Sequence, residues 1–439
     1  MHYSAVVLLA ALLSLVFIFL FSGMWLGGAL GLTGLIGFLI LLPGRGGALS
    51  AALFNFLANY SLAAIPLFVF MGGIIVESGL GGRVFSGIDK VTGIIPGGAV
   101  QTNIASCAFF AAVSGSSAAT AAAIGSIAYP EQMRRGYYPR LIVGSLAAGG
   151  TLGILIPPSV TMILYGAYTG ESVGKLFIGG VIPGIITSLM FMMYIAVWSL
   201  RNPELCPPRQ KLSLHYFREC IIGLNELWPI LLLIALIMGS IYGGIATPTE
   251  VAAIASCVAA ILAAALEKLD FNVLKKAALS TVRVLGILGF IVIGATTLAY
   301  LAGMLKIPAL LSEAVVAAGI NRFTAFFLVA LMYLVLGCFM DGISLMILTV
   351  PITYPVVVGT LGFNGIWFGV IVTMLVECAL LTPPVGMNLF MIQSITKQKD
   401  LGDVIAGSLP FFIILLCSII LCTFAPGLVT TLPEWSLSF

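Results

Sequence analysis

Two long apolar stretches of the chain, residues 111–166 and 337–392, are interrupted in the same way. Each carries a Tyr-Pro pair followed by a Pro-Pro pair, Tyr129-Pro130 and Pro157-Pro158 in the first, Tyr354-Pro355 and Pro383-Pro384 in the second. The two pairs are displaced by nearly the same number of residues, which indicates an internal duplication. Interrupted hydrophobic segments at corresponding positions of two halves indicate a secondary transporter and mark its binding site.

The composition places almost the whole chain in a membrane. It is 61% hydrophobic and 8% charged, whereas a soluble domain carries roughly a quarter charged residues. This predicts an all-α polytopic membrane protein within the lipid bilayer. A basic face for nucleic acid is missing from the sequence, so no nucleic-acid partner is expected. The eight cysteines form no CxxC pair and are expected to be free packing thiols.

Apolar segments long enough to cross a bilayer predict ten crossings, at 4–21, 24–42, 61–78, 140–166, 176–200, 225–244, 249–267, 284–305, 364–396 and 404–424. Two further apolar stretches, 94–130 and 323–355, are broken near the middle and are predicted to enter the membrane and return. With this arrangement every Lys and Arg except Arg45, Lys175, Lys306 and Arg322 falls on one side. The positive-inside rule makes that side cytoplasmic and predicts that both termini are periplasmic, in the inner membrane of a bacterium or archaeon.

The predicted domain plan has two halves of five crossings each. Residues 1–200 form the first repeat, with hairpin 94–130 and broken helix 140–166, and residues 225–439 form the second, with hairpin 323–355 and broken helix 364–396. A cytoplasmic linker, 201–224, joins them, and short amphipathic segments at 46–60 and 270–284 are expected as surface helices. Because five is odd, the second repeat is inverted relative to the first, a familiar basis for alternating access.

The first hairpin tip, Ser114-Gly115-Ser116-Ser117, lies in a stretch without charge from Val91 to Pro130. Glycine permits close approach of the backbone to a ligand, and serine adds hydroxyl groups. The helix that leaves the tip favours an anion at its N-terminus, whereas the carbonyls that end the preceding helix suit Na⁺. Close helix packing is the alternative reading of such small residues.

The Pro-Pro pairs and two carboxylates are the other candidate site features. Each Pro-Pro pair frees the carbonyls of the preceding turn for a cation or substrate, unless it is a simple proline kink. Asp341 is the only charge between Phe323 and Val376, and it can bind Na⁺, bind a proton or cap the following helix. Glu377 is a similar candidate, but it lies one turn before the break, where pairing with another group or bonding to the backbone is the alternative role.

Enzymatic function is not expected. The segment 169–176, TGESVGKL, imitates a phosphate-binding loop but lacks its first glycine and the Ser or Thr after the lysine. HExxH and GxSxG motifs do not occur in the sequence. An intramembrane enzyme would need a nucleophile–base pair or a metal cluster, and the sequence presents neither.

Three long motifs closely resemble one known family. AVSGSSAATAAAIGSIAYPE, AAGGTLGILIPPS and LLTPPVGMNLF are similar to the large membrane subunit of the tripartite ATP-independent periplasmic (TRAP) transporters, and the resemblance spans essentially the whole chain. It implies an elevator-type, Na⁺-coupled importer of an organic acid such as a C4-dicarboxylate or sialic acid, without a cofactor. It also implies two partners, a small four-helix membrane subunit and a periplasmic substrate-binding protein.

The resemblance also implies site residues. One Na⁺ site is expected at Ser114, Ser116, Gly153 and Pro157, and a second at Gly337, Asp341, Thr382 and Met387, mainly through main-chain oxygens. Substrate is expected near Ser117, Ser159, Gly342 and Asn388. The alternative function is a related cation-coupled elevator carrier that works without a binding protein. Coupling by protons instead of Na⁺ also stays open, because Asp341 and Glu377 can both carry a proton.

Overall fold

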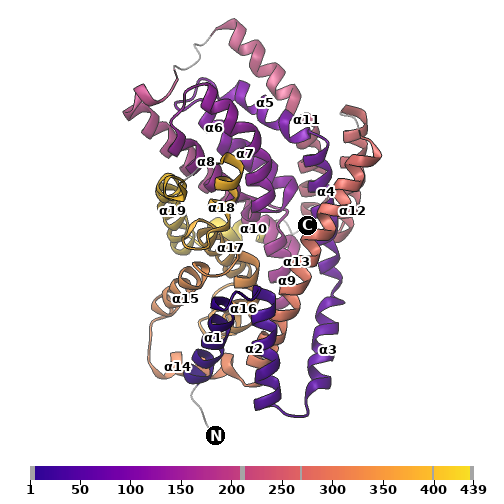
Figure 1. Cartoon of the computed structure of the whole chain (residues 1–439), viewed down its shortest axis with the longest axis vertical. Helices are drawn as coiled ribbons and strands as arrows, with labels where there is room; N and C mark the ends of the chain where they lie inside the picture. The colour runs from indigo at the N-terminus through magenta and orange to yellow at the C-terminus, as the bar shows by residue number, and fades with distance from the viewer. Residues whose placement is uncertain (1–4, 208–212, 267–268, 398–399, 436–439) are drawn as a thin grey trace.

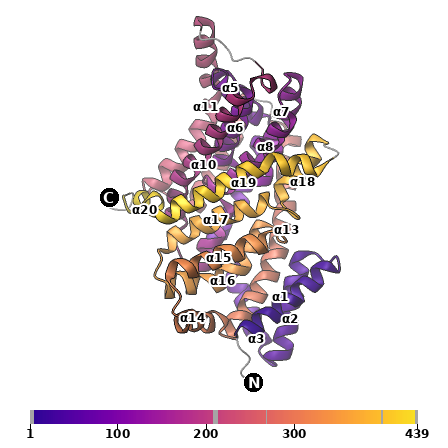
Figure 2. The ribbon, with the colours of Figure 1, turned by 90° about the vertical axis from the view of Figure 1, so that its left-hand side faces the viewer.

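The computed structural model describes residues 5–207, 213–266, 269–397 and 400–435. Of the basic residues assigned above to the cytoplasmic side, Arg209, Lys211, Lys268 and Lys399 lie outside these ranges. Within the described ranges the fold is entirely helical, without a β-strand, as predicted. Figures 1 and 2 show an elongated stack of helices in which α5 and α11 lie at one end of the long axis and α1, α3 and α14 at the other.

The helices up to residue 201 begin and end as follows: α1 Ala5–Phe21, α2 Leu26–Leu41, α3 Gly46–Leu57, the 3₁₀ turn η1 Tyr60–Ala63, α4 Ala64–Glu77, α5 Leu80–Thr92, α6 Ala99–Ser114, α7 Ser117–Arg134, α8 Pro139–Leu155, α9 Val160–Thr169 and α10 Val173–Arg201. The later elements are the 3₁₀ turn η2 Pro203–Leu205, α11 Leu214–Tyr242, α12 Pro248–Leu266, α13 Phe271–Met304, α14 Ile307–Ala317, α15 Arg322–Gly337, α16 Gly342–Tyr354, the π-helical turn η3 Pro355–Thr360, α17 Gly365–Leu381, α18 Met387–Thr396, α19 Leu401–Phe424 and α20 Gly427–Trp435.

The interrupted segments form helix–break–helix units at the positions read from the sequence. Hairpin 94–130 corresponds to α6 and α7, and hairpin 323–355 to α15 and α16. One break, at Pro157-Pro158, separates α8 from α9, and the other, at Pro383-Pro384, separates α17 from α18. Both Pro-Pro peptide bonds are cis. A proline cannot donate the helix hydrogen bond and its ring crowds the preceding turn, so two in succession end the helix.

Two segments differ from the expectation. The surface helix at 270–284 and the crossing at 284–305 are one continuous helix, α13. The corresponding part of the first half is broken, because Asn59 accepts a hydrogen bond from the Ser61 N–H at 3.0 Å and starts the turn η1 between α3 and α4. The predicted linker, 201–224, is helical from Leu214 onward, where Ser213 caps α11.

The core of the molecule is formed by the broken helices themselves. Every residue from Leu141 to Leu155 in α8 is buried, and so is every residue of α17. By contrast, α1, α2, α11, α13 and α19 expose large apolar side chains on one face. A helix that is apolar on its outer face and packed on its inner face is typical of a membrane-facing position.

Eight helical segments within the described residues are long and apolar enough to cross a membrane: Tyr60–Glu77, Pro139–Thr169, Val173–Arg201, Leu214–Tyr242, Pro248–Leu266, Phe271–Met304, Gly342–Thr360 and Leu401–Phe424. This set differs from the ten predicted crossings. The predicted crossings 4–21 and 24–42 are shorter helices, α1 with 17 residues and α2 with 16. The predicted crossing 364–396 is divided between α17, with 17 residues, and α18, with 10. Gly342–Thr360, in contrast, is long enough to cross but lies largely within the predicted hairpin 323–355.

Candidate binding site between two hairpin tips

The first tip is a tight reversal between α6 and α7. Gly115 adopts a left-handed conformation, with φ of +63°, that a side chain would strain. Ser116 then caps α7 by accepting a hydrogen bond from the Ala119 N–H at 3.4 Å. The sequence Ser-Gly-Ser therefore ends one helix and starts the next within two residues.

A cluster of oxygens lies directly behind this tip. The hydroxyls of Ser114 and Thr120 are 2.7 Å apart, and the Thr120 hydroxyl donates to the Ser116 carbonyl at 2.8 Å. Gly153 of α8 packs against the same atoms, since a Cβ there would lie 2.6 Å from the Ser116 carbonyl oxygen and 2.7 Å from the Thr120 hydroxyl. Hydroxyl and carbonyl oxygens gathered in this way are suitable ligands for a hard cation.

The first tip also touches the first Pro-Pro break. The Val160 N–H donates to the Gly115 carbonyl at 3.4 Å. A Cβ at Gly115 would lie 2.9 Å from the carbonyl oxygen of Pro158. Backbone contacts from Pro158 and Val160 therefore connect the break to the tip, and Pro157 lies one residue before Pro158.

The second tip is organised by a carboxylate. Asp341 caps α16 by accepting hydrogen bonds from the N–H groups of Ile343 at 3.1 Å and Ser344 at 3.2 Å, and from the Ser344 hydroxyl. The capping role considered in the sequence analysis is therefore present. These bonds leave acceptor capacity on the carboxylate for a further ligand, because each oxygen has two lone pairs.

The second tip meets the second Pro-Pro break in a similar manner. The Val385 N–H donates to the Cys338 carbonyl at 3.1 Å. Gly337 packs closely on Ala379 of α17, whose Cα would lie 3.1 Å from a Cβ at Gly337. The Thr382 hydroxyl donates to the Cys378 carbonyl at 2.6 Å. Each tip is thus joined to the break of its own half by a backbone hydrogen bond.

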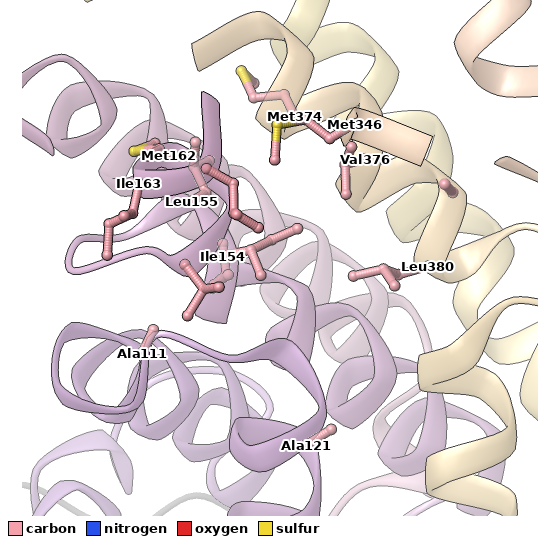
Figure 3. Close-up of a cluster of buried hydrophobic side chains, with 14 of the residues drawn as sticks. Ala111, Ala121, Ile154, Leu155, Met162, Ile163, Met346, Met374, Val376 and Leu380 are labelled. Atoms are coloured by element: carbon pink, nitrogen blue, oxygen red, sulfur yellow. The ribbon is translucent and has the colours of Figure 1, made fainter. Parts of the chain in front are cut away.

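Both tips line one cavity of about 90 Å³, which is smaller than the roughly 300–1,000 Å³ of typical small-molecule sites. Its walls come from both halves, including α4 of the first and α13 of the second. The lining residues are Val69, Gly115, Ser116, Ser117, Ala118, Ile154, Val160, Thr161, Val284, Leu288, Asp341, Gly342, Ile343, Val376, Leu380 and Met387. Figure 3 shows Ile154 and Leu155 of the first half opposite Val376 and Leu380 of the second. The apolar side chains would exclude water around a few polar groups.

Of the twelve candidate site residues, five line this cavity: Ser116, Ser117, Asp341, Gly342 and Met387. Ser114 and Gly153 lie behind the first tip, and Gly337 lies behind the second. Ser159 is fully buried, caps α9 and donates to the Ile154 carbonyl at 2.5 Å. Asn388 is also fully buried and donates to the Ala147 carbonyl at 3.1 Å.

Two residues of the site were not singled out in the sequence. Thr120 completes the first oxygen cluster, and its position four residues after Ser116 on the same helix was an available signal. Thr161 lines the cavity with a buried hydroxyl that has no hydrogen-bond partner among the described residues. Counted from the Pro-Pro pairs, the position of Thr161 corresponds to that of Met387, so the cavity has a hydroxyl on one side and a thioether on the other.

Charge is nearly missing from the cavity lining. Asp341 is the one charged residue among the lining residues given above, and neither Lys nor Arg is included. Positive potential can come instead from the N-termini of α7 and α9, which begin at the first tip and at its break. An anionic ligand therefore needs either these helix ends or bound cations.

Comparison with known proteins identifies the family. The family described as "Tripartite ATP-independent periplasmic transporter, DctM component" matches residues 13–428. The C4-dicarboxylate TRAP transporter large permease protein DctM of Pseudomonas aeruginosa is 34% identical over 409 residues, which cover 93% of this chain and 94% of that protein. The chain belongs to the DctM family of TRAP transporter large permeases.

Other members of the DctM family differ in the substrates that their names give. The sialic acid TRAP transporter large permease protein SiaM of Vibrio cholerae is 29% identical, with 96% of this chain and 97% of that protein covered. The ectoine/5-hydroxyectoine permease protein UehC of Ruegeria pomeroyi is 30% identical, with 86% and 87% covered. The named relatives are transport proteins, in agreement with the expectation that this multi-pass membrane protein is not an enzyme.

The fold of this DctM-family chain also resembles solved transporters of distant sequence. The YdaH transporter of Alcanivorax borkumensis aligns with a TM-score of 0.60 at 14% identity, over 90% of this chain and 89% of that one. At this identity the likeness concerns the fold alone.

Proposed function

We propose that this permease imports an organic acid by Na⁺-coupled secondary active transport. The observation that carries the proposal is the single cavity lined by both hairpin tips, with an oxygen cluster behind the first tip and a carboxylate at the second. Paired interrupted helices that meet at one central site are the arrangement expected of an alternating-access transporter.

The first Na⁺ site is proposed at Ser114, Ser116, Thr120, Gly153 and Pro157. The hydroxyls of Ser114 and Thr120 and the Ser116 carbonyl supply oxygens within 3.4 Å of one another. Gly153 permits this approach because it carries no side chain.

The second Na⁺ site is proposed at Gly337, Asp341, Thr382 and Met387. Asp341 supplies the negative charge, and the end of α17 supplies the Leu380 carbonyl, to which Pro384 cannot donate. The Ala379 carbonyl, opposite Pro383, accepts from the Thr382 N–H at 3.3 Å. The two sites are not equivalent, because the first consists of neutral oxygens and the second contains a carboxylate.

The substrate is proposed to lie between the tips, with its carboxylate toward the first half. Two hydroxyl donors lie there, Ser117 at the first residue of α7 and Thr161 at the second residue of α9. Gly342, with Ser159 and Asn388 behind the cavity wall, completes the proposed set. With a lining that includes neither Lys nor Arg, the carboxylate is balanced by helix ends and by the coupled Na⁺ ions.

The movement is proposed to be of the elevator type, with two inverted repeats at 1–200 and 225–439. The support is the same succession of helix, hairpin, broken helix and long helix in each half. The partners are proposed to be a small membrane subunit and a periplasmic binding protein, in an inner membrane with both termini periplasmic. One relative, the isethionate TRAP transporter permease protein DctMQ of Oleidesulfovibrio alaskensis, is longer than this chain, which covers 58% of it.

The experiment is uptake into proteoliposomes that contain the permease and its small subunit, with the binding protein added outside. Succinate, sialic acid and isethionate are tested as labelled substrates under an inward Na⁺ gradient and under an equal K⁺ gradient. Uptake that needs both Na⁺ and the binding protein supports the proposal. Uptake of an acid without any binding protein would instead identify a stand-alone carrier, and equal uptake in K⁺ would identify coupling to another ion.

A further inference from the structure

Glu377 is a second carboxylate in the transport core, and its surroundings differ from those of Asp341. It lies in α17, one turn before the helix ends at Leu381, and its side chain is 0% exposed. Neither carboxylate oxygen has a hydrogen-bond partner among the described residues, whereas Asp341 accepts from Ile343 and Ser344.

An ionised carboxylate in this position would be strongly unfavourable. Removing such a charge from water costs several kcal/mol unless donors or a counter-charge replace the water. The side chains one turn away on α17 are those of Thr373, Met374, Leu380 and Leu381, and none of them carries a charge to compensate.

The helices packed against α17 do not provide a compensating group either. Among the described residues, none of their charged or titratable side chains forms a hydrogen bond with Glu377. Examples of bonds made elsewhere are Arg140 with Asp403, Tyr165 with the Gly365 carbonyl, Tyr333 with Thr353, and Tyr354 with Glu171. The remaining such groups on those helices are Tyr168, Lys175, Tyr194, Arg201, Arg322, Cys417, Cys422 and Glu434.

A bound proton resolves the problem with the atoms present. The protonated carboxyl is neutral, so it needs neither a counter-charge nor the several donors that an ionised carboxylate requires. A Na⁺ ion would need several oxygen ligands, but Glu377 lies within the helix, where the backbone carbonyls are engaged in the helix's own bonds. The chemistry of this position therefore favours H⁺ over Na⁺.

We propose that Glu377 is a proton-binding site, separate from the two proposed Na⁺ sites and neutral in this conformation. The site adjoins the second tip, because Val376 lines the cavity and packs directly on Gly342. A proton held or released at Glu377 thus changes the charge immediately behind the wall of the substrate site. Protons then act on this transporter through α17, in addition to Na⁺ at the tips.

The test is infrared spectroscopy of the purified full-length permease at pH 7. A protonated carboxylic acid has a C=O stretching band separate from the bands of carboxylates and amides, and the band shifts in D₂O. We expect this band in the wild type and its loss in Glu377→Gln, which keeps the shape of the neutral acid. It should persist in Glu313→Gln, an exposed carboxylate on α14, and in Asp341→Asn.

Each other outcome overturns the proposal. A wild-type spectrum without the band at pH 7 means that Glu377 is ionised, whatever the variants do. A band that survives Glu377→Gln and disappears in Asp341→Asn places the proton at the tip instead. If Glu377→Gln does not fold, Glu377→Asp replaces it, and a band that does not move in frequency contradicts the assignment. None of these results depends on Na⁺ coupling or on the substrate.

Discussion

The two hairpin tips face the same cavity but present different chemistry to it. The first tip is neutral, and its oxygens belong to Ser114, Ser116 and Thr120. The second tip carries the carboxylate of Asp341, which also caps α16. Since the backbone contact between tip and break is similar in both halves, the difference lies in side chains and not in the path of the chain.

The framework around the tips shows a second asymmetry. In the first half α3 and α4 are separated by η1, whereas α13 runs without a break from Phe271 to Met304. Helix α5 forms ion pairs with two other segments, through Lys90 to Glu226 at 2.5 Å and through Asp89 to Arg135 at 2.9 Å. For the corresponding helix α14, the described residues show no salt bridge.

These differences teach that the two halves share the positions of their breaks and differ in what surrounds them. Backbone geometry at a tip is fixed by glycine, proline and caps, so it survives substitutions elsewhere. Ligand preference is fixed by a few side chains, and these diverge between the halves. The comparison can be tested by changing one tip at a time.

The largest effect is expected at the charged tip. Asp341→Ala should remove the part of the Na⁺-dependent stabilisation that the second site contributes, about 2.7 kcal/mol if Na⁺ is at 100-fold the Kd of that site, and about 1 kcal/mol more through the lost cap. Asp341→Asn keeps an oxygen for the cap and should lose only the second site's part of the Na⁺ response. The measurement is thermal unfolding in NaCl and in KCl at equal ionic strength.

The matched control for that prediction is Asp270, which caps α13 by accepting from the Val273 N–H at 2.8 Å. Asp270→Ala should lower stability equally in both salts and leave the Na⁺ response intact. A full Na⁺ response in Asp341→Asn would show that the carboxylate does not hold the cation, and the two tips would then be less different than proposed.

Gly153 tests the neutral tip through packing. A Cβ at this position would meet the Ser116 carbonyl at 2.6 Å, and overpacking of a tight contact costs about 1–3 kcal/mol. Gly153→Ala should therefore lower the free energy of unfolding by that amount, measured by denaturant or heat. In α11, Gly239 has nothing within 4 Å of a Cβ, so Gly239→Ala should be neutral or stabilising by up to about 1 kcal/mol. Equal effects of the two changes would contradict the close approach at Gly153.

The sequence was sufficient to predict the breaks of the fold but not all its continuous parts. Pro-Pro pairs in apolar sequence end a helix locally, so the ends of α8 and α17 could be read directly. The Tyr129-Pro130 pair, in contrast, lies inside α7, which continues to Arg134. The continuity of α13 could not, because an amphipathic segment followed by an apolar one looks alike whether or not the helix bends between them. The feature that distinguishes the two halves here is the cap at Asn59, which separates α3 from α4 in the first half.

The candidate site likewise contains residues that the sequence could predict and residues that it could not. Ser114, Ser116 and Gly153 were named from motifs, and the structure places them together. Thr161 could not be recognised from its spacing, because its value depends on which side of α9 faces the cavity. Ser159 was expected near the substrate, but its hydroxyl is engaged with its own helix and the Ile154 carbonyl.

A smaller effect on cation binding is expected within the neutral cluster. Thr120→Val removes a hydroxyl that bonds both Ser114 and the Ser116 carbonyl. The loss of about 1 kcal/mol of interaction corresponds to a roughly fivefold weaker Na⁺ affinity, measured as the NaCl concentration that gives half of the thermal stabilisation. Thr373→Val is the control, since that buried hydroxyl bonds only to the Gly369 carbonyl of its own helix. If both variants shift the Na⁺ midpoint alike, the effect is one of general packing and not of ligation.

The smallest expected effect separates substrate from cation at the cavity itself. Thr161→Val keeps the shape of the side chain but removes the hydroxyl that has no partner among the described residues, so folding should be unchanged. Substrate uptake should show a KM several-fold higher, consistent with the loss of one hydrogen bond of about 1 kcal/mol, while the Na⁺ midpoint of stability stays the same. Thr161→Ser restores the hydroxyl and should restore the KM. A change in the Na⁺ midpoint in Thr161→Val would instead assign this hydroxyl to the first cation cluster, and the cavity would then lack a distinct polar side for the substrate.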